Sequence, residues 1–128
     1  MINKDSIRIA IVDDDPMILR VFSSLTKQAN FHADFFPTSR EALITIGAHP
    51  KLYDLVVSDI CMPDEDGVAF ARKARTLNPN MPFMFMTGGG DSEKRREALS
   101  LGRVTFLEKP FSLIREINEN IVHFLENK

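Results

Sequence analysis

Strand-like and helix-like segments alternate along the whole chain of 128 residues, and this alternation restricts the fold more than any other feature. Short apolar runs, each typical of a buried strand, occur at residues 7–12, about 31–36, 55–57, 82–86 and 104–107. A segment with helical spacing of apolar residues, or with helix-start and helix-stop signals, follows each run. Strict alternation of this kind predicts an α/β fold with a parallel sheet and right-handed crossovers.

Five strand–helix units are too few to close an eight-stranded barrel. The expected architecture is therefore an open, doubly wound five-stranded parallel sheet flanked by five helices. We find no internal repeat and no long Gly/Ser/Pro linker, so a single domain over residues 1–128 is expected. Ligands of such sheets bind beyond the C-terminal ends of the strands, which directs attention to the residues that follow each apolar run.

Helix-start signals predict where several of the helices begin. Asp15 precedes Pro16, and Pro suits the first helical position, so Asp15 is the expected N-cap of a helix over residues 16–29. Thr38 with Glu41 three residues later has the pattern of a capping box. Ser112 is the expected cap of the last helix.

The acidic residues are unevenly distributed, and they concentrate where strands are expected to end. Seven of the 18 acids fall in two short segments: Asp13, Asp14, Asp15, Asp59, Asp64, Glu65 and Asp66. The first segment follows the first apolar run, and Asp59 follows the third. Thr87 ends the fourth run and Lys109 follows the fifth. Because the carboxyl ends of parallel strands meet at one edge of a sheet, these side chains should converge there.

Carboxylates packed closely together repel one another and stay ionised only beside a cation. Mg²⁺ suits them, because it is bound through one or two carboxylates, keeps several waters and accepts phosphate oxygens. A carboxylate beside Mg²⁺ can also attack phosphorus and form an acyl phosphate. Lys109 would then supply a positive charge and Thr87 a hydroxyl donor. Each residue alone has a simpler explanation, as a cap or a turn residue, but chain order, strand-end placement and charge together fit one site.

Composition excludes several other classes of function. The chain carries 16 Lys and Arg against 18 Asp and Glu, a net charge of −2, which lacks the basic footprint of a nucleic-acid-binding protein. No apolar run approaches the roughly 18 residues that span a membrane, and the first residues lack the features of a signal peptide. The single cysteine, Cys61, excludes an intramolecular disulfide. His32, His49 and His123 have no metal-ligand spacing. A cytoplasmic protein that contacts neither nucleic acid nor membrane is therefore expected.

Four segments resemble the motifs of the receiver domain of bacterial two-component response regulators, the CheY-like family. IVDDDP resembles the first acidic motif, and DLVVSDICMPDEDG resembles the segment that carries the phosphoacceptor. FMFMTGG resembles the strand that ends in a switch hydroxyl, and VTFLEKPF resembles the final motif. The resemblance covers the whole chain, and it implies a flavodoxin-like sheet with the strand order 2-1-3-4-5.

The resemblance also implies roles for individual residues. Asp59 would accept a phosphoryl group from a histidine kinase or a histidine phosphotransfer protein. Asp14 and Asp59 would bind Mg²⁺ directly, Asp13 would bind it through water, and the backbone carbonyl of Cys61 would be a further ligand. Lys109 would pair with the phosphoryl group.

By the same resemblance, Thr87 and Phe106 would move together on phosphorylation. The signal would appear on the face formed by the fourth helix, the fifth strand and the fifth helix. That face would engage a downstream effector, an output domain absent from this chain, or a second copy in a homodimer. A stand-alone receiver and a piece of a longer regulator or hybrid kinase are both compatible with the sequence.

Two positions vary within the family and should set how long the phosphoryl group survives: Cys61, two residues after the acceptor, and Gly89, two after the switch hydroxyl. Cys61 offers only a weak S–H group and Gly89 no side chain to align a hydrolytic water. The absence of a side chain at Gly89 could instead leave the site open to water and make hydrolysis fast. Orientation usually contributes more to such a barrier than access does, so slow self-dephosphorylation is the expectation.

Two alternative functions have specific objections. A phosphohydrolase of the haloacid dehalogenase type places a second Asp two residues after its nucleophile, where this chain has Cys61, and the chain has no cap domain. A flavin-binding electron carrier needs hydroxyl and N–H groups around the FMN phosphate, whereas the first strand–helix loop here is acidic. The expected function is therefore a signalling module rather than an enzyme with a separate substrate.

Overall fold

The computed structural model describes residues 6–88, 90, 92–108 and 114–127, with backbone only for residues 114–116. One parallel sheet has the strand order β2-β1-β3-β4-β5, which confirms the expected doubly wound architecture. Its strands are β1 (Arg8–Val12), β2 (His32–Phe36), β3 (Leu55–Asp59), β4 (Phe83–Thr87) and β5 (Val104–Glu108). The helices are α1 (Pro16–Ala29), α2 (Ser39–Ala48), α3 (Gly67–Leu77), α4 (Ser92–Leu99) and α5 (Ile114–Glu126).

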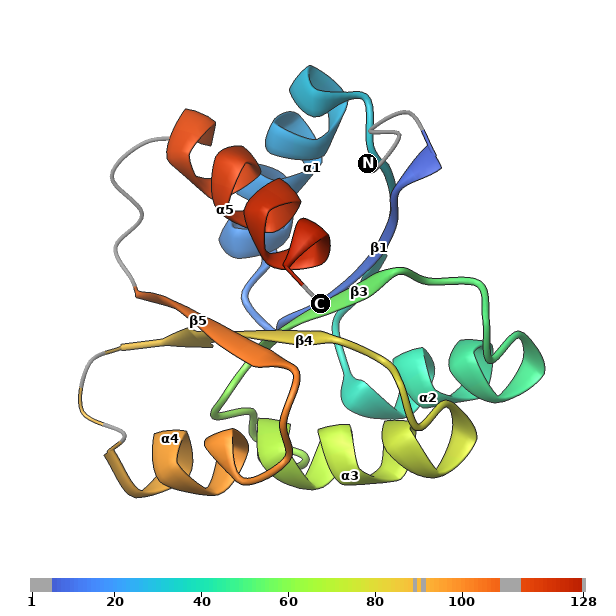
Figure 1. Ribbon diagram of the computed structural model, residues 1–128, viewed down its shortest axis with the longest axis vertical. Helices are drawn as coiled ribbons and strands as arrows, with labels where there is room; N and C mark the ends of the chain where they lie inside the picture. The colour runs from blue at the N-terminus through green and yellow to red at the C-terminus, as the bar shows by residue number, and fades with distance from the viewer. Residues whose placement is uncertain (1–5, 89, 91, 109–113, 128) are drawn as a thin grey trace.

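Helices cover both faces of the sheet, with α1 and α5 on one side and α2, α3 and α4 on the other (Figure 1). The side with α1 and α5 buries Ile11 and Phe22 in its core. The opposite side buries Phe70, Phe83 and Phe85. A sheet covered on both faces explains why β1, β3 and β4 are nearly continuous apolar runs instead of alternating ones.

Three of the strands extend one or two residues past their apolar runs, whereas β1 and β2 end with theirs. β3 continues to Asp59, β4 to Thr87 and β5 to Glu108. The pairing of Asp59 with Met86 and of Thr87 with Glu108 keeps the backbone ladder intact at these ends. A polar side chain was therefore a poor sign of where pairing stops, because the ladder is made by backbone groups.

The helix starts agree with the expected caps where the structure describes them. The Asp15 side chain accepts the Met17 N–H at 2.9 Å. Thr38 accepts the Glu41 N–H, and its hydroxyl donates to the Glu41 carboxylate, both at 3.2 Å. Ser112 lies outside the described residues. Within the described segments, none of the helices is long and apolar enough to cross a membrane.

Candidate functional site

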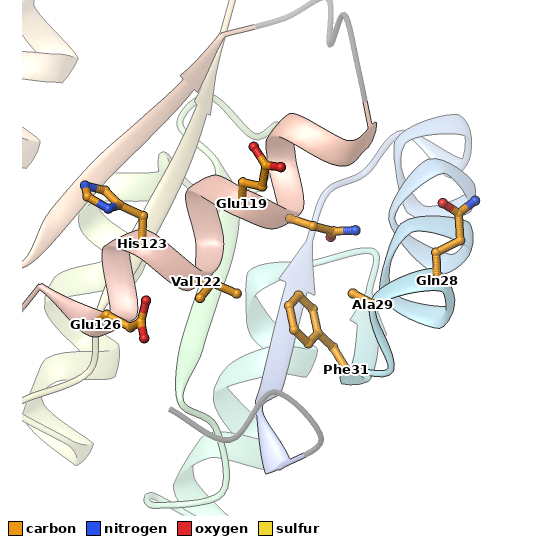
Figure 2. Close-up of a pocket in the computed structure, with 8 residues that line it drawn as sticks. Gln28, Ala29, Phe31, Glu119, Val122, His123 and Glu126 are labelled. Carbon is orange, nitrogen blue, oxygen red and sulfur yellow. The ribbon is translucent and has the colours of Figure 1, made fainter. Parts of the chain in front are cut away.

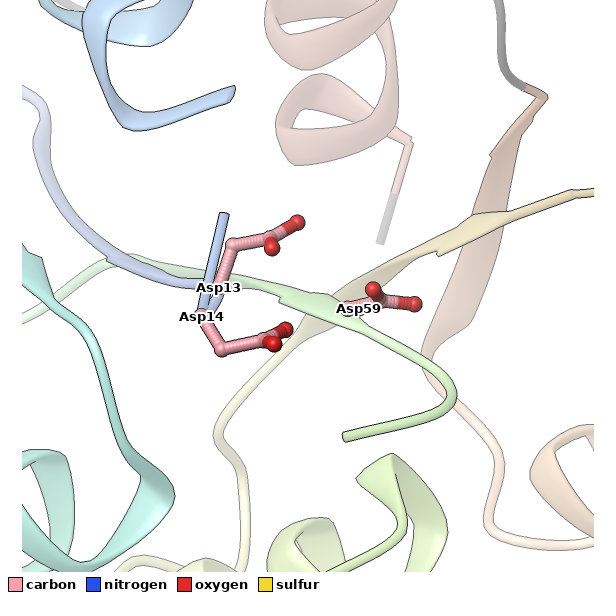
Figure 3. Close-up of side chains that lie close together, drawn as sticks. All are labelled: Asp13, Asp14 and Asp59. Atoms are coloured by element: carbon pink, nitrogen blue, oxygen red, sulfur yellow. The ribbon is translucent and has the colours of Figure 1, made fainter. Parts of the chain in front are cut away.

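Three carboxylates meet where β1 and β3 end. Asp13 and Asp14 follow β1 directly, and Asp59 is the last residue of β3, its neighbour in the sheet. One oxygen from each carboxylate lies within 4.8 Å of the others (Figure 3). The order in which strands are added to the sheet reverses at β1, since β2 pairs on one side of it and β3 on the other. Doubly wound sheets bind their ligands at this point.

Backbone groups hold the acid cluster in place. One oxygen of the Asp13 carboxylate accepts the Asp15 N–H at 2.8 Å, and the Asp13 N–H donates to the Phe36 carbonyl at 3.1 Å. The Asp59 carboxylate accepts the Cys61 N–H at 3.1 Å. Asp13 is fully buried, Asp59 is half-buried and Asp14 is exposed, so the cluster extends from the interior to the surface.

The other acids of the two segments lie elsewhere. Asp15 caps α1, and Asp66 caps α3 by accepting the Ala69 N–H at 2.8 Å. The hydroxyl of the buried Ser39 donates to the Asp64 carboxylate at 2.9 Å, and a Glu65 carboxylate oxygen lies 3.1 Å from the same hydroxyl. Among the described residues, Asp13, Asp14 and Asp59 are the only group of His, Cys, Asp and Glu side chains arranged to hold a metal ion. The candidate metal site thus contains three of the seven acids in the two acid-rich segments.

Gly67, the first residue of α3, allows that helix to approach the end of β3. A Cβ atom at this position would lie 2.5 Å from the Asp59 carbonyl oxygen and 2.9 Å from the Ile60 Cα. The Gly67 N–H also donates to the Ile60 carbonyl at 2.8 Å. We did not predict this contact from the sequence, although glycine is the residue that suits such a close backbone approach.

Thr87 and Phe106 lie on the same side of the sheet. Thr87 pairs with Glu108, and Phe106 is two residues earlier on β5, so alternation along the strand puts both side chains on the side of α4. Thr87 is fully buried, and its hydroxyl makes no hydrogen bond to any described residue. Buried polar groups are normally paired, so this hydroxyl is a candidate ligand-binding group.

An ion pair connects α4 to the loop that follows the acceptor strand. The Lys94 ammonium lies 2.9 Å from the carboxylate of Asp66. Burial acts to raise the pKa of Asp66, but hydrogen bonds from the Ala69 N–H and from Lys94 outweigh it and hold this pKa below its ordinary value. The Asp66 hydrogen bond raises the pKa of Lys94. Asp66 therefore serves both α3 and α4.

The remaining predicted residues are exposed or lie outside the described part of the chain. Cys61 is exposed beside Asp59, and Lys109 and Gly89 lie outside the described residues. His32, His49 and His123 are exposed, and none belongs to a metal-binding group.

A second hollow lies far from the acid cluster. It is a groove of about 600 Å³ between the C-terminal part of α1 and α5 (Figure 2). Its lining includes Ala29, Phe31, Asn118 and Val122. Because α1 runs from the C-terminal end of β1 back to the N-terminal end of β2, the groove lies at the N-terminal ends of the strands. The aspartates lie at the opposite, C-terminal ends. It is therefore separate from the candidate site.

Comparison with known proteins gives a consistent result. The family model of the response regulator receiver domain matches residues 9–121. The chain is 33% identical over 105 residues to the C4-dicarboxylate transport transcriptional regulatory protein DctD of Rhizobium meliloti, covering 82% of this chain and 22% of DctD. It is 36% identical over 104 residues to the transcriptional regulatory protein FixJ of Bradyrhizobium diazoefficiens, covering 80% of this chain and 49% of FixJ.

A solved structure extends this likeness to three dimensions. The beryllofluoride-activated NtrC4 receiver domain dimer superposes with a TM-score of 0.82 at 32% identity, covering 93% of this chain and 96% of that one. The matched region spans less than half of DctD and of FixJ. The family role is that of a phosphoacceptor in two-component signalling. The chain therefore belongs to the response regulator receiver domain family.

Proposed function

We propose that this chain is a receiver that takes a phosphoryl group onto Asp59 from a phosphohistidine of a histidine kinase or phosphotransfer protein. The observation that carries the proposal is the convergence of three carboxylates, from the ends of β1 and β3, within 4.8 Å of one another. Asp59 matches the acceptor position of the family motif, and its half-buried side chain remains open to a partner. Asp13 is fully buried and suits a supporting role.

The carboxylates fit Mg²⁺, because they offer hard oxygen ligands at the C-terminal ends of neighbouring strands. Asp13, Asp14 and Asp59, with the backbone carbonyl of Cys61, would hold the ion. When bound, Mg²⁺ would neutralise the mutual repulsion of the carboxylates and offer positive charge to the phosphoryl oxygens.

The residues of the chain would then carry the transfer itself. An Asp59 oxygen forms the new bond to phosphorus while the bond from phosphorus to the histidine nitrogen breaks, and the released imidazole takes up a proton from water. The buried hydroxyl of Thr87 would donate to a phosphoryl oxygen and so gain a hydrogen-bond partner. Lys109, which lies outside the described residues, would pair with another phosphoryl oxygen.

Phosphorylation would then change the face made by α4, β5 and α5 through Thr87 and Phe106. A downstream effector, an output domain or a second copy of the chain would read that face, in the cytoplasm. The NtrC4 receiver, solved as a beryllofluoride-activated dimer, supports a homodimer as one outcome. The chain acts as a signalling module, and its own chemistry is limited to accepting the phosphoryl group and losing it slowly to water. Cys61 and Gly89 set that rate.

Incubation with acetyl phosphate and Mg²⁺ tests the proposal by intact-mass measurement. Wild type should gain one phosphoryl group and Asp59→Asn none. Asp15→Asn is the matched control, because it removes a neighbouring carboxylate outside the cluster and Asn still caps a helix. Equal labelling of Asp59→Asn and wild type would contradict the assignment.

A further inference from the structure

The position of α4 depends on charged contacts more than on apolar burial. Ala98 is its one buried residue, and Leu99, its last residue, is 60% exposed. By contrast, α1 buries Phe22 and Leu25, and α5 buries Ile117, Ile121 and Leu125. A helix with so little apolar anchoring is held by its specific polar contacts, and its movement costs little hydrophobic burial.

One of those contacts involves Phe106. The guanidinium carbon of Arg95 on α4 lies over the ring of Phe106, 4.6 Å from its centroid. The same guanidinium is 3.1 Å from the carboxylate of Glu108. Phe106 and Glu108 lie two residues apart on β5, so both point to the side of the sheet that faces α4. Glu108 thus anchors the cation that covers the ring.

The ring of Phe106 has a second neighbour beneath the same helix. Phe85, its partner in the strand register, has its ring centroid 6.2 Å away, and Phe106 itself is only partly buried. Thr87 is the next residue of β4 on that side of the sheet. Any movement of Phe106 toward or away from Thr87 therefore changes the contact between its ring and Arg95.

We propose that Arg95 is a positioning residue of the switch, which holds Phe106 in its present place and so disfavours the phosphorylated conformation. This inference rests on the proposed function, because it supposes that Phe106 moves when Asp59 is modified. A contact that exists in only one of two conformations shifts the equilibrium between them by the full free energy of that contact. A partly exposed cation–π contact is strong enough to bias it by about three- to tenfold.

The test measures affinity for beryllofluoride in the presence of Mg²⁺, followed by amide chemical shifts. Arg95→Gln should bind beryllofluoride about three- to tenfold more tightly than wild type, since the unmodified state loses a contact. Glu108→Gln should change the affinity in the same direction and by less. Arg96→Gln is the matched control, because Arg96 is the next, exposed arginine of the same helix. It should leave the affinity unchanged.

A double-mutant cycle and the NMR signals of the Phe106 ring distinguish a positioning role of Arg95 from a purely structural one. In a Phe106→Leu background, Arg95→Gln should no longer alter the affinity. The aromatic ¹³C signals of Phe106 should also shift in the unmodified Arg95→Gln protein. An unchanged or weaker affinity, or the same change in the Phe106→Leu background, would overturn the proposal. If Asp59→Asn binds beryllofluoride as tightly as wild type does, the assignment of Asp59 as the phosphoacceptor is wrong instead.

Discussion

Replacement of Gly67 by Ala should damage both the stability and the chemistry of the domain. The new Cβ would lie 2.5 Å from the Asp59 carbonyl oxygen and 2.9 Å from the Ile60 Cα, and both obstacles are backbone atoms. To reach even the shortest contact that real Cβ atoms show, α3 and the end of β3 must separate by about 0.5 Å. A flexible side chain could turn away from the new methyl group, but these backbone atoms are fixed by the sheet.

The magnitude follows from two effects. Overpacking that shifts backbone costs about 1–3 kcal/mol. The hydrogen bond from the Gly67 N–H to the Ile60 carbonyl, now 2.8 Å long, would be stretched or lost, at about 1 kcal/mol. Alanine recovers a fraction of this through its lower conformational entropy in the unfolded chain. We expect the free energy of unfolding to fall by about 2–3 kcal/mol.

The phosphoryl transfer should suffer separately, because the shift displaces the backbone that carries the Asp59 carboxylate. Misplacement on the scale of an ångström can cost up to about 100-fold in rate. For the smaller shift worked out above, we expect labelling by acetyl phosphate to slow by about tenfold. Urea unfolding followed by circular dichroism measures the first effect, and time-resolved intact-mass measurement gives the second.

Gly47→Ala is the matched control. Gly47 lies within α2, and a Cβ there would meet only the Leu77 Cδ1 at 3.9 Å, an ordinary contact. This variant should gain about 0.5–1 kcal/mol of stability and keep the wild-type labelling rate. If the free energy of unfolding of Gly67→Ala lies within about 0.5 kcal/mol of the wild-type value and the variant is labelled at the same rate, the steric reasoning is refuted.

Three further predictions concern the site and its surroundings. Asp14→Ala should weaken Mg²⁺ binding strongly, measured by calorimetry, whereas Asp15→Ala should cost about 1 kcal/mol of stability as a lost cap and leave binding intact; the reverse pattern would mean that the ligands are wrongly assigned. Because the pKa of Asp66 is lowered from its ordinary value of 3.8, its charge stabilises the fold above that value and ceases to do so as the pH falls below it. The free energies of unfolding of wild type and Asp66→Asn in urea should therefore differ more at pH 7 than well below pH 3.8, and a difference that does not shrink there would exclude this charge effect. Cys61→Asn and Gly89→Gln should both shorten the life of the phosphorylated protein in decay assays, since an amide can orient the attacking water; slower decay would mean that access of water is limiting.

The sequence predicted the architecture well, because strand and helix signals alternate without interruption and both faces of the sheet are buried. It also predicted the cluster of Asp13, Asp14 and Asp59, since parallel strands end at one edge. It did not predict that Asp66 would serve two helices or that Arg95 would cover Phe106. Such contacts depend on how far α4 lies from β5, and a distance of this kind leaves no periodic pattern in a single sequence.

Asp13 and Asp59 come from strands that are neighbours in the sheet but not along the chain, because β2 and the two helices α1 and α2 separate them. The unfolded chain therefore contains no comparable cluster of oxygen ligands. Any cation that binds there binds the native state alone, and thermodynamic linkage adds its binding free energy to the resistance of the domain to unfolding. At a concentration 100 times its dissociation constant, such an ion contributes about 2.7 kcal/mol. The supply of divalent metal would then set both how readily the domain reacts and how long it survives heat and proteolysis.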